Sequence, residues 1–156
     1  IKGARSAKAY SEGVSNKIDN LDNLLSKVKI NDFSLNKAEV KSILNEIETP
    51  KDFHSYIHAL QSIEVDINTI SYVVEAYFRY LIKSTPTNFE NHLKAFINEF
   101  KDLDVNYREA LYFLSQKNKT IEFIDFIQLS SITHKDVMLL ELLRNLKCKD
   151  ITSSLI

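Results

Sequence analysis

Two histidines are the first residues whose spacing could support chemistry. His54 and His58 are four residues apart in a segment with helical spacing of apolar residues, so one helix face would carry both imidazoles. Such a pair can share a divalent metal ion, but a zinc site needs three or four ligands, and a metalloprotease helix has a glutamate where Ser55 stands. No third ligand follows at a recognisable interval. We therefore predict no metal and no cofactor, and we interpret the two histidines as candidate partner-binding residues on a helix surface.

Other reactive residues do not converge either. Glu46 and Glu48 are two residues apart, so on a helix their carboxylates point away from each other and cannot act as a general acid and base. Cys148 and His134 are fourteen residues apart in one predicted helix, which separates them by roughly 20 Å at 1.5 Å per residue. We predict that the protein is not an enzyme and has no catalytic residues.

Glycine usage excludes several large enzyme classes. Both glycines, Gly3 and Gly13, lie near the N-terminus, and residues 14–156 contain none. Phosphate-binding loops, dinucleotide-binding turns and nucleophile elbows need backbone conformations that glycine adopts most readily. The single cysteine also excludes an internal disulfide and a four-cysteine zinc site, so a reducing compartment is the expected environment.

Charge and hydropathy argue against nucleic acid and membrane partners. The 20 basic and 21 acidic residues give a net charge of −1, and no apolar run approaches the roughly 20 residues that span a bilayer. The basic residues near the N-terminus are too few for specific DNA binding, and we interpret them as a solvated helix start in which Arg5 and Lys8 could contact a protein partner. Tyr72 and Arg79, on the polar edge of a later helix, are two further candidates.

Apolar residues spaced three and four apart predict an all-α protein, a multi-helix bundle of about seven to eight helices. Residues 120–129 fit a buried helix or a buried strand by spacing, and we favour a helix because no second strand is available to pair with it. The expected helices cover residues 14–28, 36–47, 49–60, 67–83, 87–100, 104–114, 120–129 and 133–146.

Capping residues place the helix starts. Thr49 followed by Pro50 is the strongest start signal, because threonine caps helices and proline fits the first helical position. Asn36, Thr87 and Asp104 are the expected capping residues at the starts of three other helices.

The apolar spacing predicts which face is buried in two of the expected helices. The helix over residues 67–83 is expected to bury a broad face that begins at Ile67. The last helix, which is expected to begin at Thr133, is predicted to bury the stripe formed by Val137, Leu140, Leu143 and Leu146.

A five-residue pattern occurs twice. Residues 49–53 and 85–89 share Thr-Pro-x-[Asp/Asn]-Phe, followed by aliphatic or aromatic residues in the same register. The pattern indicates either two related helical units or the same helix-start chemistry used twice. We expect a boundary near residues 84–87, which gives units at 1–84 and 85–156.

Two segments resemble the HrpJ-type domain of type III secretion gatekeeper proteins. The first is Lys2-Gly3-Ala4-Arg5-Ser6-Ala7-Lys8, which leads into an amphipathic helix with Leu24-Leu25. The second, residues 47–60, reads Ile-Glu-Thr-Pro-Lys-Asp-Phe-His-Ser-Tyr-Ile-His-Ala-Leu and is similar to the family's proline-aspartate-aromatic helix start. The likeness covers residues 2–83, and Thr49 stands where the family often has aspartate.

This resemblance implies a bacterial virulence regulator without a catalytic site. Such a protein controls the order in which translocators and effectors are exported, and it binds components of the secretion apparatus, chaperones or a small helical co-regulator. It would be found in the bacterial cytoplasm, at the apparatus, or among the secreted proteins. Family members are stacks of helical X-bundles in chains about twice this long, which would make the sequence part of a longer protein. An unrelated helical adaptor is the alternative, and a small helical enzyme using the two histidines is a third.

Overall fold

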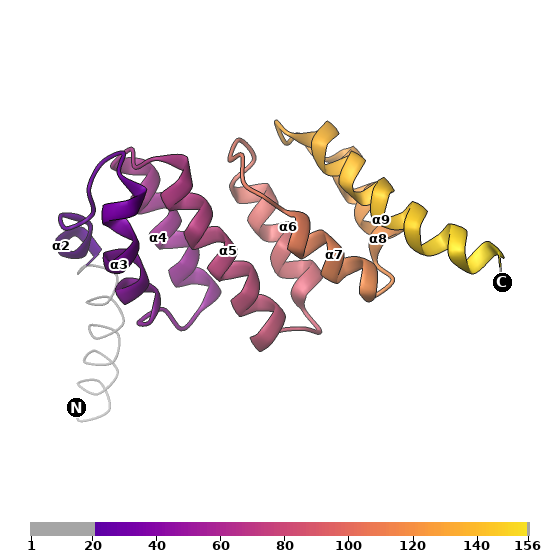
Figure 1. Ribbon diagram of the computed structural model, residues 1–156, viewed down its shortest axis with the longest axis horizontal. Helices are drawn as coiled ribbons and strands as arrows, with labels where there is room; N and C mark the ends of the chain where they lie inside the picture. The colour runs from indigo at the N-terminus through magenta and orange to yellow at the C-terminus, as the bar shows by residue number, and fades with distance from the viewer. Residues whose placement is uncertain (1–20, 156) are drawn as a thin grey trace, which may run out of the picture. The chain divides into compact units, whose positions relative to one another are not determined.

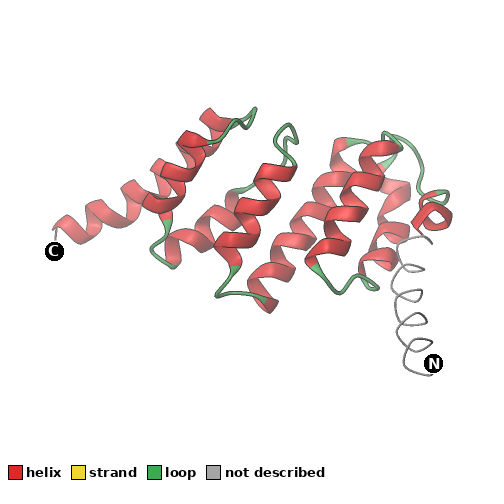
Figure 2. Cartoon of the chain, turned by 180° about the vertical axis from the view of Figure 1, so that it is seen from behind, coloured by secondary structure: helices red, strands yellow, loops and turns green. Residues whose placement is uncertain are grey.

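The computed structural model describes the backbone of residues 21–155 and the side chains of residues 21–146. All regular structure in this part of the chain is helical (Figure 1), and short loops join the helices (Figure 2). The helices are α2 (Leu21–Leu25), α3 (Phe33–Leu44), α4 (Pro50–Ser62), α5 (Ile67–Ser84), α6 (Phe89–Glu99), α7 (Arg108–Gln116), α8 (Thr120–Leu129) and α9 (Lys135–Leu155). The prediction of an all-α fold with seven to eight helices is therefore confirmed over residues 21–155, including the helix at 120–129.

The chain divides into two compact units, residues 1–74 and 75–156, with the boundary inside α5. The boundary expected from the sequence lies at the end of the same helix, and the assignment of an HrpJ-like unit to residues 1–84 stays a prediction. In the first unit α2 packs against α4, and in the second α9 packs against both α7 and α8. Within the described residues, no helix is both long and apolar enough to cross a bilayer.

The start of α4 is as the sequence predicts. The Thr49 hydroxyl oxygen accepts a hydrogen bond from the Asp52 backbone N–H at 3.2 Å, and Pro50 is the first helical residue. The apolar stripe that follows is buried, as is the matching stripe of α6: Phe53, Ile57 and Leu60 in α4, and Phe89, Leu93 and Phe96 in α6. However, the repeated Thr-Pro pair differs in role, because Pro86 lies in the turn before α6 while Pro50 lies inside α4.

Two other helix starts differ from the sequence prediction. Thr87 does not begin α6, which begins at residue 89 after the cap residue Asn88. Asp104 does not begin α7, which begins at residue 108; the Asn106 side-chain oxygen accepts from the Arg108 backbone N–H there at 2.9 Å. Both errors have the same cause, since several residues with capping side chains lie close together and spacing alone does not choose between them.

Asn36 was also misassigned as a helix start, since it is a fully buried residue inside α3. The helix is capped by Asp32, whose carboxylate accepts from the Leu35 N–H at 3.1 Å. The Asn36 amide instead bonds both the backbone N–H and the backbone carbonyl of Lys29, and donates to the Thr69 hydroxyl oxygen at 3.3 Å. Because Thr69 lies in the first turn of α5, this buried amide joins three segments of the first unit.

Aromatic rings form the core of the second unit. The Phe96 ring lies 4.8 to 6.2 Å, between ring centroids, from each of four other rings: those of Phe100, Phe78, Tyr77 and Tyr107. These are the tilted and edge-on geometries that aromatic pairs prefer. The cluster joins α5, α6 and the loop before α7, and so it fixes the position of that loop.

The turns between the described helices are built without glycine. In this part of the chain three residues have positive φ, namely Asn31 at 61°, Glu64 at 57° and Asn118 at 59°. Glu64 and Asn118 each follow the cap of a helix, α4 and α7 respectively. At α4 the Val65 N–H reaches the Leu60 carbonyl at 3.4 Å and the Glu64 N–H reaches Gln61 at 3.2 Å, which is the Schellman motif. Asparagine tolerates this left-handed conformation, whereas glutamate adopts it at a cost of about 1 kcal/mol.

Candidate interaction surface

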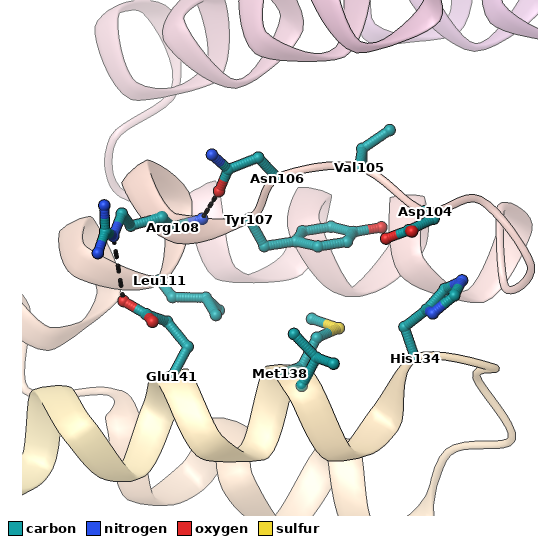
Figure 3. A pocket seen from close by; sticks show the side chains of 10 residues that line it. Asp104, Val105, Asn106, Tyr107, Arg108, Leu111, His134, Met138 and Glu141 are labelled. Atoms are coloured by element: carbon teal, nitrogen blue, oxygen red, sulfur yellow. Dashed lines mark hydrogen bonds and ion pairs between the residues drawn. The ribbon is translucent and has the colours of Figure 1, made fainter. Parts of the chain in front are cut away.

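A cavity of about 220 Å³ lies between the loop before α7 and the first turns of α9, within the second unit. Burial alternates along this loop: Val105 and Tyr107 are buried, while Asp104 and Asn106 are exposed. Figure 3 shows Tyr107 and Leu111 on one side of this space and Met138 and Glu141 of α9 on the other, while Val105 points away from α9. The lining residues are Asp104, Val105, Asn106, Tyr107, Arg108, Leu111, His134, Val137, Met138 and Glu141.

Two loops are joined at one end of this cavity. The Thr133 backbone N–H donates to the Lys101 carbonyl at 3.1 Å, and the Thr133 hydroxyl donates to the Asp102 carboxylate. Thr133 was expected to start the last helix, but α9 begins at Lys135 and Thr133 instead fastens the loop before α9 to the loop after α6. These two hydrogen bonds connect the segments that lead into the two sides of the cavity.

Glu141 holds two arginines beside the cavity. Its carboxylate lies 3.7 Å from Arg108 Nε and 3.6 Å from Arg144 Nη1, so one acid on α9 bridges a base on α7 and a base on its own helix. The arginine side chains are 69% and 58% exposed, while that of Glu141 is 21% exposed. Exposed pairs of this kind add at most about 1 kcal/mol of stability each, so the arginines remain free to exchange partners with a bound molecule.

A second cavity adjoins the first and shares Asn106, Arg108 and Glu141 with it. It extends to Tyr112, which is 56% exposed, and to Asn145. The Asn145 amide nitrogen is buried and has no hydrogen-bond partner among the described residues. Buried donors of this type are normally satisfied, so Asn145 offers a hydrogen bond to whatever enters the cavity.

The outer face of α9 is apolar and uncovered. Val137, Leu140 and Leu143 are 69%, 63% and 52% exposed, and we call these three residues the open face of α9. The apolar spacing predicted that this stripe is buried, which is wrong: α9 instead buries Met138 and Leu142. Ile67, expected at the start of another buried face, is likewise exposed.

The ionisable side chains of this surface include one buried phenol, that of Tyr107. Burial, and to a smaller extent the charge of Asp104, raise the pKa of the Tyr107 hydroxyl above its usual range, so this phenol stays protonated at neutral pH. Among the described residues, no three histidine, cysteine, aspartate or glutamate side chains are placed to hold a metal ion. What the surface offers is an apolar stripe, two arginines, a carboxylate and an amide donor.

Among the described residues, none of the candidates named from the sequence lines either cavity. Arg5 and Lys8 lie outside the described residues. His54 is half-buried and His58 is exposed on α4, in the first unit. Tyr72 packs its ring against Phe33, with 5.8 Å between the ring centroids, and is therefore held by α3.

The last candidate, Arg79, is exposed on α5. The residues that sequence reasoning missed are those of α9, although one signal was present. Residues 137–143 contain six apolar residues in seven, which is more than one buried face of a helix requires.

Comparisons with known proteins yield no relative. No family model matches this chain, and neither the curated proteins nor the solved structures contain a significant match.

Proposed function

We propose that this chain is a non-enzymatic helical module that binds another protein chain through the open face of α9 and the two adjoining cavities. The observation that carries the proposal is the exposure of three apolar residues, Val137, Leu140 and Leu143, which lie one after another along one face of α9. Water-facing apolar stripes of this kind are typical of protein interaction sites. The expected occupant is an amphipathic helix, because a helix laid along α9 would cover all three residues at once.

Charges beside the stripe define the expected partner further. Asp136 and Arg144, both exposed, lie on the same side of α9 as Leu140. A partner helix with an apolar stripe and flanking charges of both signs therefore fits this face, whereas a nucleic acid or an anionic lipid does not.

Photo-crosslinking in the native cell tests the proposal. A photoreactive residue in place of Leu140 is expected to give a discrete protein adduct, which mass spectrometry then identifies. The control is Leu35 on α3, which is equally exposed at 60% and belongs to the first unit. The proposal fails when position 140 gives no discrete adduct, or when position 35 gives the same one.

A more specific role, control of export order in type III secretion, rests on the sequence resemblance at residues 2–8 and 47–60 alone. It requires that deleting the gene changes the amount or order of exported translocators and effectors. An unchanged secretion profile in the deletion strain removes this role and leaves the binding module in place, as an unrelated helical adaptor.

A further inference from the structure

The exposed residues of α9 are arranged symmetrically about Leu140. Val137 and Leu143 lie three residues before and after it, and Asp136 and Arg144 lie four residues before and after it. All five are exposed. Since residues three and four apart share a helix face, the five form one surface with Leu140 at its centre.

This arrangement is self-complementary in an antiparallel helix pair. When two copies of α9 meet at Leu140 with opposite directions, position 136 of one copy lies level with position 144 of the other. Aspartate then lies level with arginine at both ends of the contact, valine lies level with leucine between them, and the two Leu140 side chains meet at the centre. A twofold interface needs this property, because the same patch must complement itself.

From this we infer that the partner of the open face of α9 is a second copy of this chain, in a twofold antiparallel pair centred on Leu140. The inference rests on the proposed function, since it names the occupant of the same surface. A parallel pair is disfavoured because it places Asp136 level with Asp136 and Arg144 level with Arg144.

The small contact area predicts a weak dimer. Stable interfaces bury about 1,200 Å² or more in total, which three apolar residues from each chain do not reach. We therefore expect a dissociation constant on the order of 100 µM. Arg144 already lies 3.6 Å from Glu141, so in the pair it is shared between its own chain and Asp136 of the second copy.

Sedimentation equilibrium of the 156-residue protein up to about 1 mM tests the association. The protein is expected to become dimeric with rising concentration, and Leu140→Glu is expected to remain monomeric. Leu35→Glu is the matched control and is expected to dimerise as the unsubstituted protein does. Circular dichroism verifies that both variants retain their helices. A monomer throughout, or a dimer that Leu140→Glu leaves unchanged, overturns the inference.

Charge exchange tests the orientation. Asp136→Arg alone sets arginine against arginine at both ends, and Arg144→Asp alone sets aspartate against aspartate, so each variant should dimerise about tenfold more weakly. An equimolar mixture of the two variants is expected to recover dimers, because each mixed pair has both contacts complementary. Absence of recovery overturns the antiparallel arrangement.

The two proposals fail separately. A protein that is monomeric at all concentrations, but whose residue 140 crosslinks to a different protein, removes the second copy as occupant and retains the binding module. Absence of both association and a crosslinked adduct removes both proposals.

Discussion

Replacing Asn36 by alanine tests whether the buried amide holds the first unit together. The side chain is fully buried and makes three hydrogen bonds, two with the Lys29 backbone and one with the Thr69 hydroxyl. Each hydrogen bond contributes about 1 kcal/mol net, and alanine returns about 0.5 kcal/mol through its higher helix propensity. The expected loss in the free energy of unfolding is therefore about 2 to 3 kcal/mol.

This loss in the free energy of unfolding is smaller than it would be if all the hydrogen-bond partners of Asn36 stayed buried and unpaired, for two reasons. Lys29 is exposed, so water can reach part of its backbone after the substitution. The Thr69 hydroxyl still donates to the Asp66 carboxylate at 2.9 Å. The substitution therefore costs less than leaving every partner buried and without a hydrogen bond.

Urea unfolding monitored by circular dichroism measures the change. The matched control is Asn91→Ala, because Asn91 is an exposed asparagine inside α6 and its replacement changes helix propensity alone. That control is expected to be neutral or slightly stabilising. A difference of less than about 1 kcal/mol between the two variants would contradict the reasoning, since it would mean that the amide contributes no more than an exposed one.

Three further predictions concern strain and buried phenols. Glu64→Gly should raise the free energy of unfolding by about 0.5 to 1 kcal/mol in urea, because it removes a glutamate from the left-handed conformation. Asn118→Gly should raise the free energy of unfolding by less, since asparagine tolerates this conformation, and an equal or larger increase there contradicts the prediction. Tyr56→Phe should raise the free energy of unfolding by about 1 kcal/mol, since the buried hydroxyl has no hydrogen-bond partner among the described residues, and a loss of stability refutes this. Burial raises the pKa of Tyr56, Tyr77 and Tyr107, so above the unfolded pKa of about 10 the unfolded chain holds fewer protons than the folded one. The free energy of unfolding should therefore fall by about 1.4 kcal/mol per pH unit for each tyrosine. Ultraviolet absorbance of the phenolate should show these three side chains ionising only when the protein unfolds, and their ionisation in the folded protein near pH 10 refutes the prediction.

Apolar spacing was sufficient to predict most of the helices and most of their buried residues, while the helix at residues 120–129 also required the argument that no second strand could pair with it. Phe53, Ile57 and Leu60 are buried as expected, and so is the stripe of α6. These helices carry one apolar face each, so only one orientation satisfies the sequence. The start of α4 was predictable for a similar reason, because Thr49 and Pro50 are specific to the first positions of a helix.

Asn36 shows where the same reasoning fails. An asparagine followed by glutamate three residues later is typical of a helix start, yet the chain uses Asp32 for that purpose and buries Asn36. The hydrogen bonds that make burial favourable come from Lys29 and Thr69, and Thr69 is 33 residues away in sequence. A pattern read along one segment does not contain partners at that distance.

The sequence did not predict the open face of α9 for a related reason, which also explains why this helix is the candidate for binding a partner. A helix with apolar residues on two faces has two possible orientations, and periodicity does not distinguish them. The choice is made by the neighbours: α7 and α8 contact α9 from one side and cover Met138 and Leu142. The remaining face, with Leu140 at its centre, has no neighbour in the described part of the chain. An apolar excess on one helix is thus the sequence signal for a surface, but the structure is needed to show which residues form it.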